Sequence, residues 1–282
     1  MLRTRVLTAV ILAPLVVWLV WGAPSWVLGT AVVAVMAAAG WEWSRFAGLT
    51  ACRGRAVYTL ACALACGLAW AAAAVVPRGG VLAGITLGWW VLPVARLAVF
   101  ARSRGRLPAH DGFDGLAGVA TLAAASGAIM VVAMQAPAAP VWLTALLVLV
   151  WGGDIGGYFA GRRWGRRRLA PTISPGKTWA GVGGGMALGL AAAAVVAVLG
   201  DWIPGDGWLP LSPWLAVAGV ATIALSIVGD LFESMLKRQR GLKDSGQMLP
   251  GHGGLLDRID ALLAAAPVVA VTAFALGGGV HA

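Results

Sequence analysis

Charged side chains are scarce in this sequence. Lysine, arginine, aspartate and glutamate make up 11% of the 282 residues, whereas soluble domains carry roughly a quarter. No charged residue occurs between Arg5 and Glu42, or between Asp114 and Asp154. A helix needs about 20 apolar residues to cross a membrane, so each of these two runs is long enough for two crossings. The sequence therefore predicts a polytopic membrane protein.

Cysteine and acidic residues are also few. Two of the three cysteines, Cys62 and Cys66, lie four residues apart in an apolar run, where lone thiols pack as small apolar groups. With only 11 acidic residues, the chain has a net charge of +10. Basic loops of a membrane protein explain this excess better than nucleic acid does, so we expect no nucleic-acid partner. The 15 tryptophans are suited to the membrane interface.

The apolar runs predict an all-α fold with about nine transmembrane helices. Arg3 and Arg5 precede the first run as in a signal peptide, but membrane sequence continues after it, which favours an uncleaved helix. The expected helices are 6–22, 26–42, 56–76, 80–101, 115–136, 140–161, 178–199, 211–230 and 259–280.

The distribution of basic residues predicts the orientation in the membrane. Nine crossings place every lysine and arginine except Arg78 and Arg96 on the side of the N-terminus. Because basic loops stay in the cytoplasm, we expect the N-terminus to be cytoplasmic.

The two parts of the chain differ in character. Residues 1–136 form about five expected helices with little polar chemistry. Residues 137–282 contain two long cytoplasmic segments, 162–177 and 231–258, which are rich in charge, glycine and proline. The second part is therefore the expected catalytic region.

Acidic residues at membrane depth require an explanation, because each charge there costs at least about 2.5–3.5 kcal/mol. Asp154 and Asp230 lie in or at the end of expected helices, and Asp257 and Asp260 open the last one. Residues three apart share a helical face, and paired carboxylates repel unless a cation binds between them. Hard oxygen ligands near phosphate suggest Mg²⁺. Alternatively, Asp257 and Asp260 cap a helix N-terminus.

Basic residues crowd the same segment, 234–260. Cations, glycines and paired carboxylates suit a triphosphate, since its transfer needs positioning and charge neutralisation. Contact with anionic lipid would account for the cations but not for the DRID or HGG sequences. His252, between glycines, is either a turn residue or a base. The basic residues are Lys237, Arg238, Arg240, Lys243 and Arg258.

A second candidate phosphate site lies at 169–185. It is not a Walker A loop, because Pro171 stands where that motif needs glycine. Ser174, Lys177 and Thr178 nevertheless precede a helix, whose N-terminal N–H groups attract phosphate. Thr178 could instead cap that helix, and the two roles are compatible.

One long pattern resembles a known family. Fourteen residues between Ser234 and Asp260 match the signature of phosphatidate cytidylyltransferases. The segments 41–48 and 153–185 also resemble that family. Ala180 departs from the pattern, since many relatives carry Glu or Gln there. The matching residues are Ser234, Lys237, Arg238, Lys243, Asp244, Gly246, Leu249, Pro250, His252, Gly253, Gly254, Asp257, Arg258 and Asp260.

The resemblance implies the reaction of CTP with phosphatidate, giving CDP-diacylglycerol and pyrophosphate. It also implies a homodimer in the cell (inner or plasma) membrane, with a cytoplasmic active site that holds Mg²⁺, either alone or with a second metal ion. The implied metal ligands are Asp230, Asp257 and Asp260, which with Lys237 form the catalytic set. The implied substrate-binding residues are Ser174, Lys177, Ser234, Arg238, Lys243, Asp244, His252 and Arg258.

Two other functions are considered. In a secondary transporter, Asp154 and Asp230 would be coupling sites, but the sequence has no evident inverted repeat and its charge gathers on one face. The other is a CTP-using enzyme acting on a different lipid, such as an isoprenoid-ether lipid or a polyprenol. Measuring activity with different lipid substrates would distinguish that enzyme from a phosphatidate cytidylyltransferase.

Overall fold

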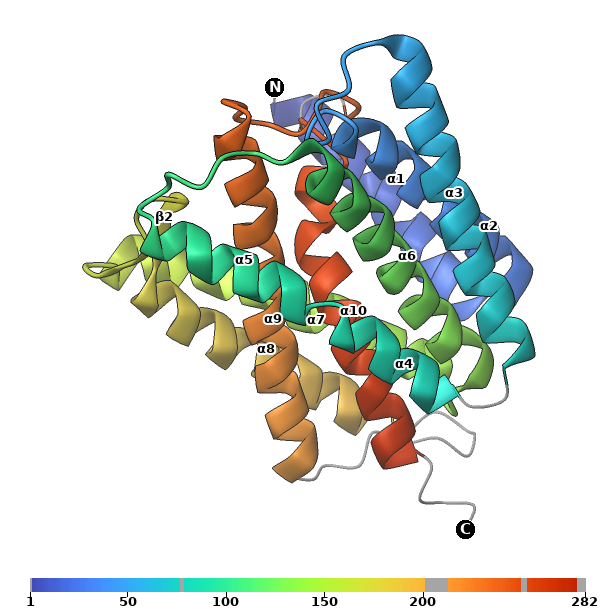
Figure 1. Ribbon diagram of the computed structural model, residues 1–282. Coiled ribbons are helices and arrows are strands. Elements are labelled where there is room, and N and C mark those ends of the chain that lie inside the picture. The colour runs from blue at the N-terminus through green and yellow to red at the C-terminus, as the bar shows by residue number, and fades with distance from the viewer. Residues whose placement is uncertain (1, 77–78, 201–212, 250–252, 278–282) are drawn as a thin grey trace.

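The computed structural model describes residues 2–76, 79–200, 213–249 and 253–277. They form a bundle of helices with one short β-hairpin (Figure 1). The elements are α1 (Leu2–Trp21), α2 (Ser25–Trp43), α3 (Cys52–Val75), α4 (Gly79–Gly88), α5 (Val91–Arg102), α6 (Asp111–Gln135), α7 (Ala139–Trp164), β1 (Arg168–Ala170), β2 (Ser174–Thr178), α8 (Trp179–Gly200), α9 (Pro213–Gln239) and α10 (Leu256–Gly277).

Eight stretches of the described chain are long and apolar enough to cross a membrane, with α4 and α5 together counted as one. In α1, the described apolar part is Val10–Trp21, which is shorter than the others. The prediction of an all-α, polytopic membrane fold is confirmed. The count of nine crossings and the cytoplasmic N-terminus stay predictions.

Three local features differ from the expected helix boundaries. The expected helix 80–101 is broken at Trp89 and Trp90, just before Pro93, which is tolerated in the first turn of a helix but not in its interior. Helix α9 continues to Gln239 rather than ending at 230. Its extra turns bury Phe232, Met235 and other apolar side chains in the core, and this packing stabilises the longer helix. Residues 168–178 form the antiparallel hairpin β1–β2.

Helices α6 and α10 lie at the centre of the bundle and carry the largest shares of buried residues among the membrane-spanning stretches. Near the charged end, an aromatic cluster joins α2 to α9. The ring of Trp43 lies 5.9 Å from that of Phe46 and 6.4 Å from that of Phe232. The Trp43 indole also donates a hydrogen bond of 2.9 Å to the backbone oxygen of Asp114 on α6. This cluster fixes the ends of three helices around the site described below.

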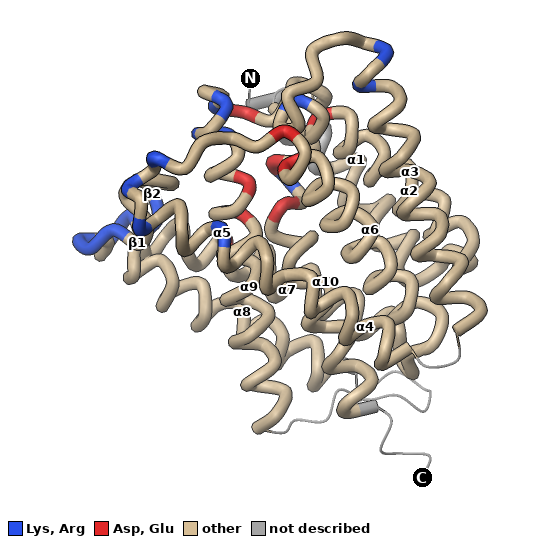
Figure 2. Tube along the Cα trace, in the orientation of Figure 1, with Lys and Arg blue, Asp and Glu red and all other residues tan. Residues whose placement is uncertain are grey.

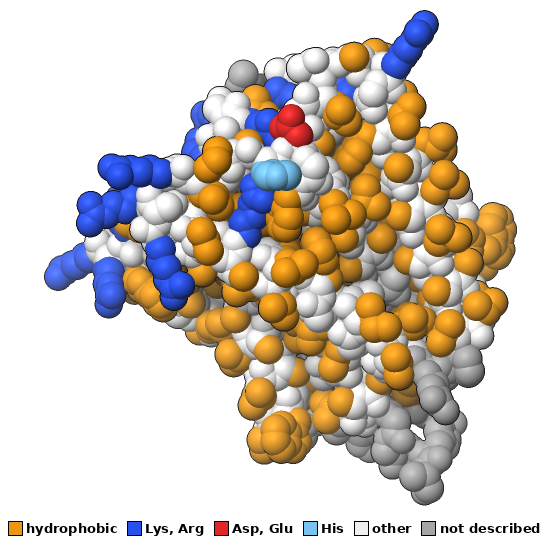
Figure 3. All heavy atoms as spheres, in the orientation of Figure 1, with side chains coloured by type: hydrophobic (Ala, Val, Ile, Leu, Met, Phe, Trp, Pro, Cys, Tyr) orange, Lys and Arg blue, Asp and Glu red, His pale blue; other side chains and the backbone are white. Residues whose placement is uncertain are grey.

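Charged residues gather at one end of the bundle. Figure 2 shows lysines, arginines and acidic residues where α2 and α9 end and α10 begins, whereas the opposite end of the drawn tube is almost free of them. On the face seen in Figure 3, apolar side chains cover most of the remaining surface. Such a surface suits lipid contact on the sides and water at the charged end.

Helices α7 and α8 pack along a seam of glycines. A side chain at Gly156 would collide with the backbone of Gly184, and one at Gly184 would collide with Ala160 and Gly156. Similar close approaches occur at Gly185 and Gly189. Small residues let helix backbones approach closely in membranes. The seam therefore sets the position of Asp154 on α7 relative to Lys177, which lies in β2 two residues before α8.

We expect Gly184→Ala to destabilise the protein by about 1–3 kcal/mol, because the added methyl group overpacks the seam. Gly183→Ala is the matched control, since Gly183 is exposed and has open space around it. Glycine to alanine raises the intrinsic helix propensity equally at both positions, so a difference between the variants reports on packing. Thermal unfolding in detergent should show a lower midpoint for Gly184→Ala only. Equal midpoints would contradict the role of the seam.

Candidate active site

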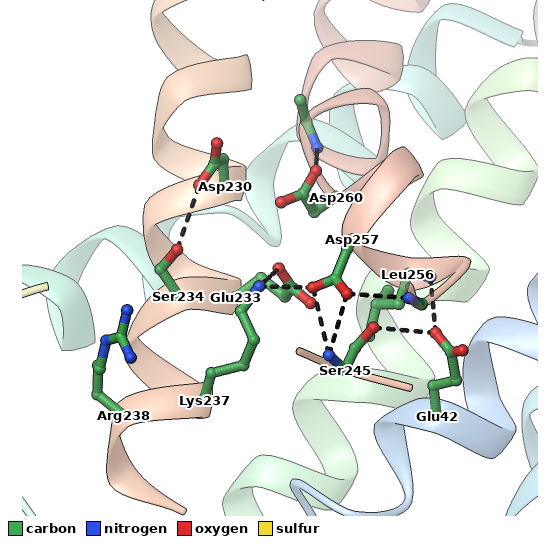
Figure 4. Close-up of polar contacts among 12 residues, drawn as sticks. Glu42, Asp230, Glu233, Ser234, Lys237, Arg238, Ser245, Leu256, Asp257 and Asp260 are labelled. Carbon is green, nitrogen blue, oxygen red and sulfur yellow. Dashed lines mark hydrogen bonds and ion pairs between the residues drawn. The ribbon is translucent and has the colours of Figure 1, made fainter. Parts of the chain in front are cut away.

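A lysine joins the last turns of α9 to the first turn of α10. The ammonium nitrogen of Lys237 lies 2.6 Å from Glu233 Oε2, one turn earlier on α9, and 2.6 Å from Asp257 Oδ1 on α10 (Figure 4). The side chains are 12%, 2% and 12% exposed. At this burial, an unpaired charge is strongly unfavourable. Lys237 therefore holds two carboxylates together and links the two helices.

Asp257 also organises the loop that precedes α10. Its carboxylate accepts hydrogen bonds from the backbone N–H of Ser245, at 3.1 and 3.3 Å, and from that of Gly254, at 3.2 Å. Both N–H groups belong to the loop before α10, and Asp257 itself lies in the first turn of α10, where a negative charge is favourable. The capping role considered from sequence is thus present at Asp257, together with the contact to Lys237.

Glu42, at the end of α2, is a site residue that the sequence reasoning missed. It is 1% exposed, and its Oε2 accepts hydrogen bonds from the Ser245 hydroxyl at 3.0 Å and the Leu256 N–H at 2.8 Å. Glycines at 246 and 254 leave room for its carboxylate. Its position at the end of a long uncharged run, inside 41–48, could have marked it. Its hydrogen-bond partners, however, cannot be identified from the sequence.

A second group of polar residues surrounds Asp230. Lys177 lies 2.7 Å from Asp230 Oδ2, and the Ser234 hydroxyl donates to Asp230 Oδ1 at 3.2 Å. The carboxyl group of Asp260 on α10 faces that of Asp230 on α9 (Figure 4). The two helices come this close at Gly229, where a Cβ atom would lie 2.6 Å from the backbone oxygen of Asp260.

A polar cavity of about 170 Å³ opens beside this group, between α7, β2, α8 and α9. Asp154, Tyr158, Lys177 and Ser226 line it, together with Thr178 and several glycines. The Thr178 hydroxyl accepts a hydrogen bond of 3.0 Å from the Gly181 N–H, so it caps α8. Lys177 borders both the cavity and Asp230, and places a positive charge where an anionic group would enter.

The other predicted residues lie around these two groups. Arg238 donates to the backbone oxygen of Ile173 in the hairpin at 3.3 Å, which brings α9 and the β1–β2 turn together. Ser174 is half-buried in β2, whereas Lys243, Asp244 and Arg258 are exposed. His252 lies outside the described residues. The structure therefore gathers Lys177, Asp230, Ser234, Lys237, Asp257 and Asp260 most closely.

The carboxylates fit a divalent cation only in part. Within the described ranges, no three His, Cys, Asp or Glu side chains are arranged as a metal-binding group. Asp257 is engaged by Lys237 and by two backbone N–H groups. Asp230 and Asp260 face each other from neighbouring helices and offer the oxygen donors that Mg²⁺ prefers.

Comparisons with known proteins identify relatives over nearly the whole chain. Residues 3–276 match a family described as the cytidylyltransferase family. A protein of Pseudomonas aeruginosa named phosphatidate cytidylyltransferase is 39% identical over 283 residues, which cover 99% of both chains. One of the same name from Brucella suis is 36% identical over 287 residues, covering 95% of this chain and 92% of the relative. Another, from Haemophilus influenzae, is 49% identical over 43% of this chain and 42% of its own.

Replacing Lys237 should reveal how strongly it holds the site together. We expect Lys237→Met to destabilise the protein by about 3–5 kcal/mol, because Glu233 and Asp257 would lose their shared cation while remaining buried. Lys243→Met, at an exposed lysine, should stay within about 0.5 kcal/mol of the unchanged protein. Denaturation in mixed micelles measures both, and similar values for the two variants would be evidence against the bridge.

Replacing Glu42 tests the anchoring of the loop before α10. Glu42→Ala leaves the Ser245 hydroxyl and the Leu256 N–H without their acceptor, which should cost about 1–3 kcal/mol for each buried group. Glu42→Gln keeps an acceptor oxygen in the same place and should cost less. We expect limited proteolysis to cut residues 240–255 faster in Glu42→Ala than in Glu42→Gln. Equal protection in both variants would rule out the anchoring role.

Proposed function

This chain belongs to the cytidylyltransferase family, and we propose that it transfers the cytidylyl group of CTP to phosphatidate for phospholipid biosynthesis. The products are CDP-diacylglycerol and pyrophosphate. The observation that carries this proposal is the position of Lys177 and Lys237 among carboxylates, at the charged end of a bundle with apolar sides. The names of the nearly full-length relatives support the same reaction.

The reaction brings together two anions. An oxygen of the phosphatidate phosphate attacks the α-phosphorus of CTP, a new phosphorus–oxygen bond forms, and the bond to the β-phosphate breaks as pyrophosphate leaves. The nucleophile is already ionised, so no strong base is required. Mutual repulsion is the main obstacle, and positioned cations reduce it. Lys177 and Lys237 are proposed to supply that positive charge.

We place the lipid phosphate in the polar cavity and the CTP phosphates beside α9. Lys177 lines the polar cavity and contacts Asp230, so it would bind the phosphate of phosphatidate. Ser234 lies about one turn before Lys237 and Arg238 on α9 (Figure 4), and these three residues would hold the triphosphate. Lys243, Asp244 and Arg258 are exposed at the same end and complete the proposed substrate-binding set with Ser174 and His252.

A magnesium ion is part of the proposal. Asp230 and Asp260 would hold it, because their carboxyl groups face each other and repel in its absence. When bound, it would neutralise charge on the phosphates and on the departing pyrophosphate. The role of Asp257 as a third ligand and the second metal ion stay predictions, since Asp257 contacts Lys237 instead.

We also propose that the charged end faces the cytoplasm, where CTP is found, and that the membrane is the cell membrane. The lysines and arginines gather at the end that holds the site (Figure 2), and cytoplasmic loops are rich in these residues. The homodimer implied by the resemblance stays a prediction.

The proposed reaction can be tested with purified protein, labelled CTP, phosphatidate and Mg²⁺ in mixed micelles. We expect labelled CDP-diacylglycerol from phosphatidate but not from polyprenol or isoprenoid-ether substrates. Asp230→Asn should lower kcat by on the order of a hundredfold and raise the Mg²⁺ concentration needed for half-maximal activity.

Asp111→Asn is the matched control, because this carboxylate is 71% exposed and contacts Arg240 rather than the site. It should leave kcat and the Mg²⁺ requirement nearly unchanged. Full activity of Asp230→Asn would remove the proposed metal role. Turnover of another lipid in preference to phosphatidate would replace the proposed substrate.

A further inference from the structure

An apolar cavity of about 380 Å³ lies between α7, α8, α9 and α10. Apart from two threonines, its lining is apolar, and it includes Trp142, Leu149 and Ala193. The hydroxyls of Thr222 and Thr272 donate hydrogen bonds of 2.8 Å to the carbonyl oxygens one turn earlier in their own helices. They therefore have no donor left to offer, and the cavity suits a hydrocarbon ligand rather than a polar one.

This apolar cavity neighbours the polar cavity that Lys177 lines. On α7, Leu149 lines the apolar cavity and Gly153 the polar one; on α9, Thr222 and Ser226 do the same. Residues four apart lie about one helical turn, or 5.4 Å, from each other on the same face. The two cavities therefore follow one another along the same faces of α7 and α9, with the polar cavity nearer the charged end and the apolar one extending to Pro213 at the start of α9. The pair of cavities is called the groove below.

We propose that the apolar cavity holds an acyl chain of phosphatidate while its phosphate lies beside Lys177, and that the space inside the cavity sets which chain lengths are accepted. This inference rests on the proposed function. A ligand with an anionic group at one end and a hydrocarbon chain at the other matches the groove in both chemistry and order. A free phosphate or nucleotide would leave the apolar part unfilled, and an unrelated lipid tail would make no use of Lys177.

Small side chains line part of the apolar cavity on the side away from the polar one. Ala193 on α8 and Ala216 on α9 line it, each farther along its helix from the polar cavity than Leu190 and Gly219 are. A large side chain at either alanine would shorten the space without reaching Lys177 or Asp230. Length discrimination in apolar pockets arises in this way, and one methylene group is worth about tenfold or more.

The test compares dioleoyl and dioctanoyl phosphatidate at the same mole fraction in micelles. We expect Ala193→Phe to lower kcat/KM for the long-chain substrate by about tenfold relative to the short-chain one. Ala191→Phe is the matched control, because Ala191 is exposed on the same helix and does not line the cavity. It should leave the ratio unchanged. Ala216→Leu provides a smaller obstruction from α9 and should shift the ratio in the same direction.

Each outcome bears on the inference. The same long-to-short ratio in the unchanged protein, Ala193→Phe and Ala216→Leu would overturn it, even with all three active. A change of oligomeric state in Ala193→Phe with an unchanged ratio would assign the cavity to a second copy of the chain and overturn it too. If the unchanged protein converts neither phosphatidate, the proposed function itself fails and this inference fails with it.

Discussion

The arrangement of the site depends on the pairing of carboxylates with lysines at the end of an apolar bundle. A charge near lipid is costly unless a partner compensates for it. Lys237 compensates for Glu233 and Asp257, and in doing so it ties α9 to α10. Lys177 compensates for Asp230 and ties the hairpin to α9. The same ion pairs that stabilise this end of the fold therefore place two ammonium groups where phosphates would bind.

Close backbone packing makes this pairing possible. The glycines of α7 and α8 bring Asp154 and Lys177 to the same polar cavity, and Gly229 brings Asp230 to face Asp260. Side chains at these positions would push the helices apart. In lipid there is little hydrophobic force to press helices together, so small residues and van der Waals contact set their spacing.

The sequence predicts those parts of the molecule that depend on local properties. Apolar runs predict the helices, and the spacing of Asp257 and Asp260 predicts that both carboxylates lie on one helical face, because residues three apart lie together. It does not predict that α9 extends to Gln239, since buried Phe232 and Met235 stabilise those turns from other helices. It also misses Glu42, whose partners Ser245 and Leu256 are more than 200 residues away along the chain. Long-range pairing of this kind leaves no pattern in one sequence.

The balance of charge within the site bears on the proposed magnesium ion. Asp230, Glu233, Asp257 and Asp260 are gathered at the contact of α9 and α10, while Lys177 and Lys237 are the ammonium groups in contact with them. The carboxylates outnumber these ammonium groups, so both lysines are engaged by carboxylates. A divalent cation between Asp230 and Asp260 would offset that excess and leave the lysines to share their charge with phosphate oxygens. The excess of carboxylates is therefore a reason to expect a metal requirement. Lysines that are already paired with carboxylates bind phosphate less well, and a metal ion held by the carboxylates would release them.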